Sequence, residues 1–396
     1  MASAYSTLPA KAKLAPSRFT AHASDEQLAD FHQLLKLSKI APETYEGLQT
    51  DRRFGITTNW LTEAKAAWEN FNWRACEAHI NSFPNFTVPI KEGGDEFDIH
   101  FVALFSKKED AVPLLMLHGW PGSFMEFLPI MKILKNEFNE EILPYHVVVP
   151  SLPGYAYSSK PPLHRDFRLE NVANVVNDLM IGLGFGDGYV VQGGDIGSKV
   201  GRVLGALHPE VKAVHLNFCI MSKPDAVDPA DVNEGERIGW VRAKEFERIG
   251  SAYAIEHATR PATIGMVLAT SPLALLAWIG EKFLQWTDED PPLATILESV
   301  TLYWLTESFP TSIYPYRQLF TPGYVTAHDK LGYLDKPFGF SWFPYEIAPI
   351  PRSWAATTGN LVFYRQHEQG GHFAAVEQPD VLLADVVAFV DQVWKK

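Results

Sequence analysis

The sequence predicts an α/β protein with a mostly parallel sheet and helices on both of its faces. Between residues 96 and 222, short apolar runs alternate with helical stretches, and each run ends in a loop rich in Gly and Pro. This rhythm then stops for a helical insertion and resumes near the end of the chain. We therefore expect an N-terminal helical segment at 1–95, a core in two parts at 96–222 and 331–396, and a helical lid at 223–330.

The N-terminal segment has a helical pattern from Asp25 to Ile80. Ser24 and Gln27 are spaced as a capping box, and apolar residues follow them at helical intervals. A second helix is predicted from Thr62 to Ile80. The next stretch, Phe97 to Phe105, alternates as a strand does.

The core elements follow in order. The predicted strands are Val112–Leu117, Val147–Val149, Tyr189–Gln192, Val211–Leu216 and Leu361–Tyr364. The predicted helices are Phe124–Phe138, Leu169–Leu183, Lys199–Leu207 and Val381–Trp394. Because ligand sites in such sheets lie at the carboxyl ends of the strands, the Gly-rich loops at these ends are candidates for a site.

Composition limits the functional classes. The 396 residues include 46% hydrophobic and 20% charged residues, a globular balance, and the net charge of −13 argues against nucleic acid or an anionic membrane as a partner. Cys76 and Cys219 are too few for a disulfide framework or a four-ligand zinc site. No signal peptide is visible, and the longest apolar stretch, Pro272 to Gly280, is too short for a membrane span. We expect a soluble cytoplasmic protein.

The strongest motif is GGDIGS at residues 193–198, where a strand runs directly into a helix. Glycines on both sides of Asp195 give this turn the pattern of a nucleophile elbow, with Asp in the place that Ser usually takes. An ionised carboxylate there can attack an electrophilic carbon and form an ester. The alternative is an Asp N-cap on a glycine-rich turn.

The loop HGWPG, residues 118–122, follows an earlier strand. It can direct the backbone N–H of Trp120 toward the elbow, where the N–H of Ile196 would be the second donor of an oxyanion hole.

His372 lies in GGHF after the last strand and is the candidate general base. Glu346 is favoured as the carboxylate that orients it, and Asp335 is the alternative. A zinc site built on His367, Glu368 and His372 is not expected, because the spacing differs from HExxH and two glycines interrupt any helix.

The motifs HGWPGS, PSLPGY, GGDIGS, WLTESFP and GGHFAA together resemble the epoxide hydrolases of the α/β-hydrolase superfamily, closest to the microsomal-type branch and its soluble fungal members. The resemblance covers nearly the whole chain. It implies that Asp195 opens an epoxide to an alkyl-enzyme ester, and that water activated by His372 and Glu346 releases a diol. It also implies that no cofactor or metal is needed, and that a homodimer is possible.

The same resemblance implies two lid tyrosines that hydrogen-bond the epoxide oxygen. By local pattern these are Tyr253 and Tyr316, and Tyr314 is the rival for the second position. Tyr314, Phe373 and Trp120 are candidate substrate contacts. A phenol can donate to an oxygen on which negative charge develops.

Two other functions share parts of this pattern. Haloalkane dehalogenases share an Asp elbow, but commonly carry a Trp directly after the nucleophile, where this chain has Ile196. A non-catalytic binding protein of the same fold would usually have lost a member of the set Asp195, Glu346 and His372, and all three are present.

Overall fold

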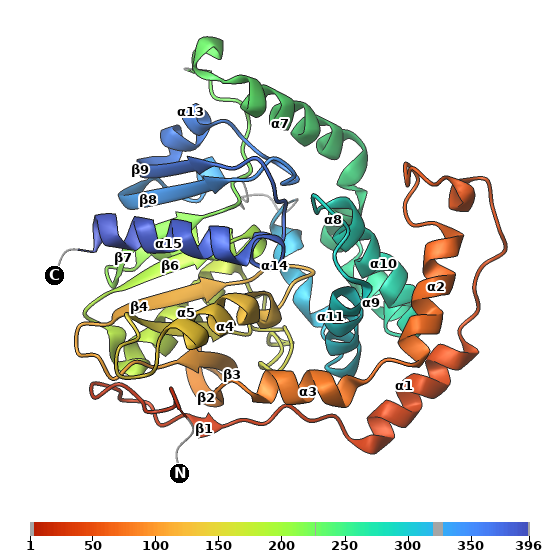
Figure 1. Ribbon diagram of the computed structural model, residues 1–396, viewed down its shortest axis with the longest axis horizontal. Helices are drawn as coiled ribbons and strands as arrows, with labels where there is room; N and C mark the ends of the chain where they lie inside the picture. The colour runs from red at the N-terminus through yellow and green to blue at the C-terminus, as the bar shows by residue number, and fades with distance from the viewer. Residues whose placement is uncertain (1–3, 226, 320–327, 395–396) are drawn as a thin grey trace.

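The computed structural model describes residues 4–225, 227–319 and 328–394 (Figure 1). Residues 226 and 320–327 of the predicted lid therefore lie outside the described residues, as do 1–3 and 395–396 at the two ends.

Within the described residues, nine strands form one sheet in the order β1-β2-β3-β5-β4-β6-β7-β8-β9. Neighbours from β1 to β5 pair antiparallel, and all neighbours from β5 to β9 pair parallel, so the predicted mostly parallel sheet is confirmed. The bounds are Ser17–Arg18 (β1), Asn85–Glu92 (β2), Asp95–Leu104 (β3), Val112–Leu117 (β4), Tyr145–Pro150 (β5), Tyr189–Gly193 (β6), Val211–Leu216 (β7), Leu334–Trp342 (β8) and Gly359–Gln366 (β9).

Helices cover both faces of this sheet (Figure 1). Successive residues of a strand point to opposite faces, so Leu115 and Leu117 of β4 join one apolar core while Leu114 and Met116 join the other. The first core is closed by α5 and α6, and the second by α4 and α15. These helices span Leu128–Glu137 (α4), Leu169–Met180 (α5), Asp195–Leu207 (α6) and Pro379–Val393 (α15).

The helical insertion lies between β7 and β8, where the sequence predicts a lid, and occupies one side of the sheet in Figure 1. Its helices are α7 (Glu234–Glu245), α8 (Ala252–Thr259), α9 (Pro261–Leu268), α10 (Pro272–Gln285), α11 (Leu293–Leu305) and α12 (Phe309–Ser312), followed by a 3₁₀ segment, η6 (Tyr314–Leu319). Within the described ranges, no single helix is long and apolar enough to cross a membrane; α9 and α10 together have the length and composition but are bent by 118°.

The N-terminal segment is only partly as predicted. Helix α1 (Asp25–Leu37) begins with the expected capping box of Ser24 and Gln27. The predicted helix Thr62–Ile80 is wrong, because two helices occupy this region, α2 (Thr58–Glu69) and α3 (Trp73–Asn81). Asn72 accepts a hydrogen bond from the N–H of Ala75, and this cap starts a new helix. The segment also contributes β1 and β2, since Phe86, Val88 and Ile90 alternate toward the core.

The N-terminal helices pack on the lid, with α1 against α10 and α11 and with α3 against α11 (Figure 1). Trp68 of α2 is fully buried, and its indole N–H donates to Thr301 Oγ1 of α11 at 2.8 Å. Phe31 of α1 packs on the same indole, at 4.9 Å between ring centroids. The N-terminal segment therefore packs on the outer side of the lid. The predicted division of the chain into four parts, with boundaries at residues 95, 222 and 330, stays a prediction.

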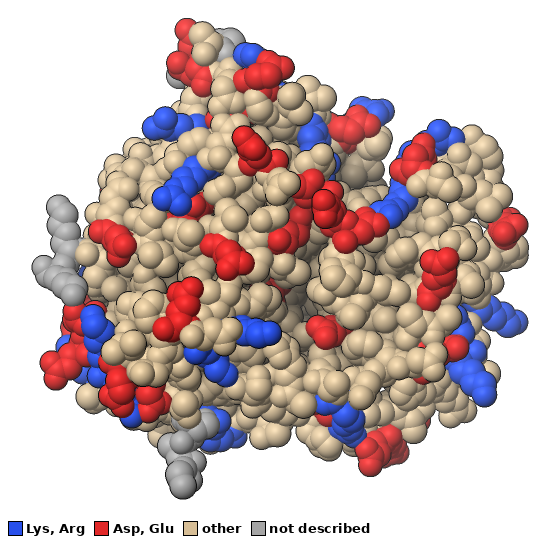
Figure 2. Space-filling view, viewed as in Figure 1, with Lys and Arg blue, Asp and Glu red and all other residues tan. Residues whose placement is uncertain are grey.

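Charged side chains are distributed over the visible face without a continuous basic patch (Figure 2). Lys and Arg lie among more numerous Asp and Glu, as the net charge of −13 requires.

We expect Trp68→Ala to lower the free energy of unfolding by about 3–5 kcal/mol, because it opens a cavity and leaves the Thr301 hydroxyl without its donor. Urea denaturation followed by circular dichroism measures this loss. Trp304→Ala, at a half-buried tryptophan of α11, is the control and should cost less. An equal or smaller loss for Trp68→Ala would show that α2 does not brace the lid.

Candidate active site

The turn between β6 and α6 carries Asp195 in a left-handed backbone conformation, with φ of +43°. Asp tolerates this region better than most residues, yet it is still strained. The neighbouring glycines are required because backbone atoms of other residues lie where their Cβ atoms would be. A Cβ on Gly193 would lie 2.5 Å from the carbonyl oxygen of Gly197, and one on Gly197 would lie 2.2 Å from that of Leu117. The turn therefore has the geometry that the GGDIGS pattern predicts.

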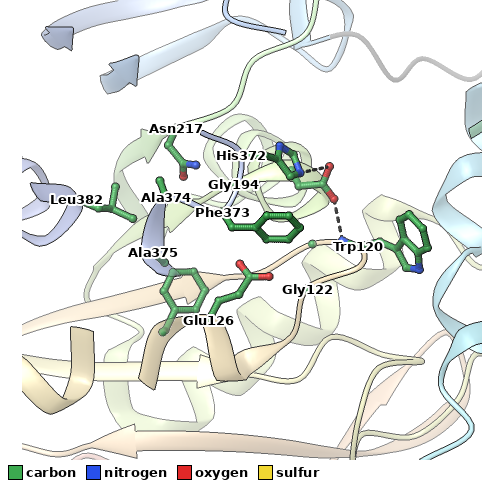
Figure 3. Close-up of a pocket in the computed structure, with 13 residues that line it drawn as sticks. Trp120, Gly122, Glu126, Gly194, Asn217, His372, Phe373, Ala374, Ala375 and Leu382 are labelled. Carbon is green, nitrogen blue, oxygen red and sulfur yellow. Dashed lines mark hydrogen bonds and ion pairs between the residues drawn. The ribbon is translucent and has the colours of Figure 1, made fainter. Parts of the chain in front are cut away.

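The Asp195 carboxylate is bound on one oxygen and accessible at the other. Its Oδ1 accepts the backbone N–H of Trp120 at 2.8 Å, and the N–H of Ile196 also donates to the carboxylate. Oδ2 lies 3.5 Å from His372 Nε2, and 15% of the side chain is exposed (Figure 3). Burial alone would raise the pKa of Asp195, but His372 and the two N–H donors lower it below its usual value. The carboxylate is thus ionised and within reach of a reactant.

His372 and Glu346 form a closed pair behind Asp195. His372 follows β9, Glu346 follows β8, and the two meet with Nδ1 to Oε1 at 2.6 Å. Their side chains are 2% and 3% exposed. Burial would lower the pKa of His372, but the carboxylates of Glu346 and Asp195 raise it well above the usual value. Asp335, the alternative acid, is instead an exposed residue of β8.

The lid holds the two loops that carry this pair. The backbone N–H of His372 donates to the carbonyl of Trp286, at the end of α10, at 2.8 Å. Arg242 of α7 donates to the carbonyl of Glu346 at 3.1 Å and to that of Gln285 at 3.0 Å. Lid and core are therefore joined by hydrogen bonds at the site itself.

Tyr253 and Tyr316 lie together over Trp120. Tyr253 of α8 stacks on the indole at 5.4 Å, and Tyr316 of η6 meets its edge at 5.9 Å. The two phenol rings are 5.8 Å apart, and both hydroxyls are close enough to Asp195 for its charge to raise their pKa further, after burial, which is the larger cause. Both phenols are therefore protonated and can donate a hydrogen bond.

Of the remaining candidate residues, Phe373 lies at the site and Tyr314 does not. Phe373 borders the same site as His372 and stacks on Phe283 at 4.4 Å. Tyr314 lies elsewhere, because its hydroxyl donates to the carbonyl of Pro153 at 3.1 Å and its ring packs on Phe167. The geometry thus favours Tyr316 over Tyr314 as the partner of Tyr253.

His367 does not join His372. Its Nε2 lies 2.6 Å from Oδ2 of Asp385, a residue of α15. Across the described ranges, no group of three or more His, Cys, Asp or Glu side chains is arranged to hold a metal ion.

Two residues near Asp195 were not predicted from the sequence. Tyr155 is fully buried, its hydroxyl has no hydrogen-bond partner among the described residues, and the charge of Asp195 contributes to its raised pKa. Glu126 borders a small cavity with Asp195 and His372 (Figure 3). Their only signals in the sequence are a tyrosine closing PSLPGY and a single carboxylate in the apolar stretch after HGWPGS.

The raised pKa of His372 predicts a pH dependence of stability. In the unfolded chain the imidazole loses its proton near pH 6.5, while in the folded protein it keeps it to higher pH. The stabilisation is therefore complete below about pH 6.5 and falls above it, by at most about 1.4 kcal/mol per pH unit, until the folded pKa is passed. The unfolding free energy of wild type minus that of His372→Gln, measured by urea denaturation from pH 6 to 9.5, should show this fall. The exposed His164→Gln is the matched control, and a difference that stays constant with pH would contradict the assignment.

Comparison with known proteins gives a consistent result. The profile described as "Epoxide hydrolase N terminus" matches residues 16–127, and the one described as "alpha/beta hydrolase fold" matches 112–244. A putative epoxide hydrolase of Dothistroma septosporum is 46% identical over 99% of this chain and 94% of its own length. Epoxide hydrolase 1 of Oryctolagus cuniculus is 32% identical over 96% and 89%. The structure of Aspergillus niger epoxide hydrolase superposes with a TM-score of 0.94 at 55% identity, covering 99% of this chain and 100% of that one.

Proposed function

Since this chain belongs to the epoxide hydrolase family of the α/β-hydrolase fold, we propose that it hydrolyses epoxides to vicinal diols through an ester on Asp195. The observation that carries the proposal is the Asp195 carboxylate itself. It is ionised at an elbow, with one oxygen bound by the backbone N–H of Trp120 and the other 3.5 Å from His372 Nε2. A carboxylate held in this way is a nucleophile toward a strained, uncharged carbon.

In the first step, a carboxylate oxygen of Asp195 attacks an epoxide carbon and the ring C–O bond breaks. The bonding electron pair stays on the epoxide oxygen, which takes a proton from the phenol of Tyr253 or Tyr316. Support comes from the pairing of these rings over Trp120 and from their electrostatic contact with Asp195. Two donors converging on one oxygen supply the stabilisation that an alkoxide leaving group needs.

Esterification changes the charge balance around His372. The resting imidazolium is stabilised by two carboxylates, Glu346 and Asp195. Once Asp195 is an ester it is neutral, so the pKa of His372 falls and its proton can return to the tyrosinate. The neutral imidazole becomes a base only after the intermediate has formed.

In the second step, His372 takes a proton from water, and the water oxygen attacks the carboxyl carbon of the ester. The oxyanion that forms there is stabilised by the N–H groups of Trp120 and Ile196. Collapse breaks the acyl C–O bond, and the leaving oxygen takes the second proton of the added water, which the Asp195 carboxyl group carries at that point. The diol leaves, and the carboxylate of Asp195 is restored beside the imidazolium. The cycle consumes one epoxide and one water and returns every proton.

Halide release from chloroalkanes is the second candidate, since it needs the same carboxylate. The pair of phenols favours oxygen, because a leaving alkoxide needs a proton and a leaving halide does not. A homodimer remains a prediction of the resemblance, and a cytoplasmic location remains a prediction from the sequence.

The test of the function is a single turnover in ¹⁸O-water, with enzyme in excess over a mono-substituted aryl epoxide. We expect an unlabelled diol, because both of its oxygens then come from the epoxide and from Asp195. Mass spectrometry of the diol gives the answer. Label in the first-turnover diol would mean direct attack by water, and halide released from chloroalkanes without any diol would favour the dehalogenase.

We expect Tyr253→Phe and Tyr316→Phe each to slow ester formation by about 10²-fold, through loss of acid assistance. Tyr314→Phe is the matched control, because its hydroxyl is occupied by the carbonyl of Pro153. Rapid quenching of single turnovers, with the ester measured by intact-protein mass, gives these rates. A loss in Tyr314→Phe that is absent in Tyr316→Phe would reverse the assignment.

A further inference from the structure

A small cavity lies beside the nucleophile and the base (Figure 3). Its volume is about 20 Å³, measured as the space open to the centre of a water molecule, which is enough for one water. Asp195, His372, Glu126 and Asn217 are among the side chains that border it, and none of the described tyrosines does. The cavity is therefore separate from the phenols that would activate an epoxide oxygen.

Glu126 is built into the wall of this cavity. It lies in a short 3₁₀ segment, η2 (Phe124–Phe127), directly after the loop that supplies the Trp120 N–H. Its Oε1 occupies the place that a side chain on residue 122 would need, since a Cβ on Gly122 would lie only 1.3 Å away. The backbone N–H of Ser123 donates to the same carboxyl group. Figure 3 shows its carboxyl group directed toward the other labelled side chains that line the cavity.

Hydrolysis of an ester on Asp195 needs a water that meets two conditions at once. It must reach His372 Nε2, to lose a proton, and it must reach the carboxyl carbon of Asp195, to form the new bond. The cavity borders both residues, and the carboxyl group of Glu126 and the amide of Asn217 are further polar groups around it. A water with only one partner would rotate freely, whereas a second fixed partner orients its lone pair.

We propose that Glu126 is a positioning residue that holds the hydrolytic water between His372 and the carboxyl carbon of the Asp195 ester. This inference rests on the proposed function and assigns Glu126 to the second step alone. It adds to the set Asp195, His372 and Glu346 a carboxyl group from the opposite wall of the cavity.

The surroundings of Glu126 keep its carboxyl group neutral. Burial raises the pKa of Glu126 to about 8; His372 opposes this rise, and the charge of Asp195 adds a smaller rise. The resting enzyme thus keeps Glu126 protonated. In the intermediate Asp195 is a neutral ester and His372 has lost its charge, so burial still holds Glu126 neutral, and its carbonyl oxygen can accept a hydrogen bond from the water.

The test separates the two steps in Glu126→Gln and Glu126→Leu. We expect ester formation to stay within about twofold of wild type, and ester hydrolysis to fall about tenfold in Glu126→Leu and less in Glu126→Gln, which keeps one hydrogen bond. Single turnovers with an aryl epoxide, followed by intact-protein mass, give both rates and the amount of ester that accumulates. His372→Gln is the positive control for trapped ester. Glu298→Gln is the matched control, because it is also a half-buried glutamate with a pKa raised by burial, but it does not border the cavity.

Each outcome has one meaning. Slower hydrolysis with unchanged ester formation supports the inference. Unchanged hydrolysis in both variants overturns it, and so does an equal fall of both rates, because loss of both steps indicates a disturbed Trp120 loop. Should Glu126→Leu fail to fold, Glu126→Gln retains the shape and decides the matter. A wild-type enzyme that forms no ester at all would overturn the proposed function itself.

Discussion

The buried negative charge of Asp195 is the constraint on which the site depends. Asp195 has a left-handed backbone conformation in the turn after β6. The turn is possible only because Gly193 and Gly197, on either side of it, have no Cβ where other backbone atoms lie close. A carboxylate in such a place is costly unless it is paired, and two N–H donors and an imidazolium provide the pairing. In the proposed mechanism ester formation removes this charge, and its neighbours then lose the interaction that set their protonation. In the proposed cycle, the order of the steps thus follows from the charge on the Asp195 carboxylate.

Residues of the lid hold in place the core loops that surround Asp195. The backbone carbonyl of Trp286 and the guanidinium of Arg242, both from the lid, bind the loops that carry His372 and Glu346. The lid in turn is packed against α1 and α2, with Trp68 as the buried contact. None of the described N-terminal residues borders the small cavity at Asp195. The segment instead packs on α10 and α11, and the carbonyl of Trp286 at the end of α10 binds the loop of His372.

Local turn chemistry made much of the site predictable. GGDIGS and HGWPG could be placed because glycine is required by geometry at those turns, and the alternation of apolar runs located them at strand ends. Sequence spacing could not decide between Tyr314 and Tyr316, since two residues of a 3₁₀ segment point in different directions according to packing. Glu126 was missed because a lone carboxylate in a short helix has the pattern of a solvent-exposed face. The break before α3 was missed because an N-cap can interrupt an otherwise continuous helical pattern.

The placement of the lid between β7 and β8 has a consequence for how the protein reaches its native state. Val214 of β7 pairs with Phe338 of β8, so two adjacent strands can meet only after the whole insertion has been accommodated. Such a pairing closes a long loop, which carries an entropic cost and slows folding. Asp195 precedes this junction, and Glu346 and His372 follow it. A chain folded only as far as β7 would thus carry the proposed nucleophile without its proposed base, and the complete set would form only when β8 and β9 join the sheet.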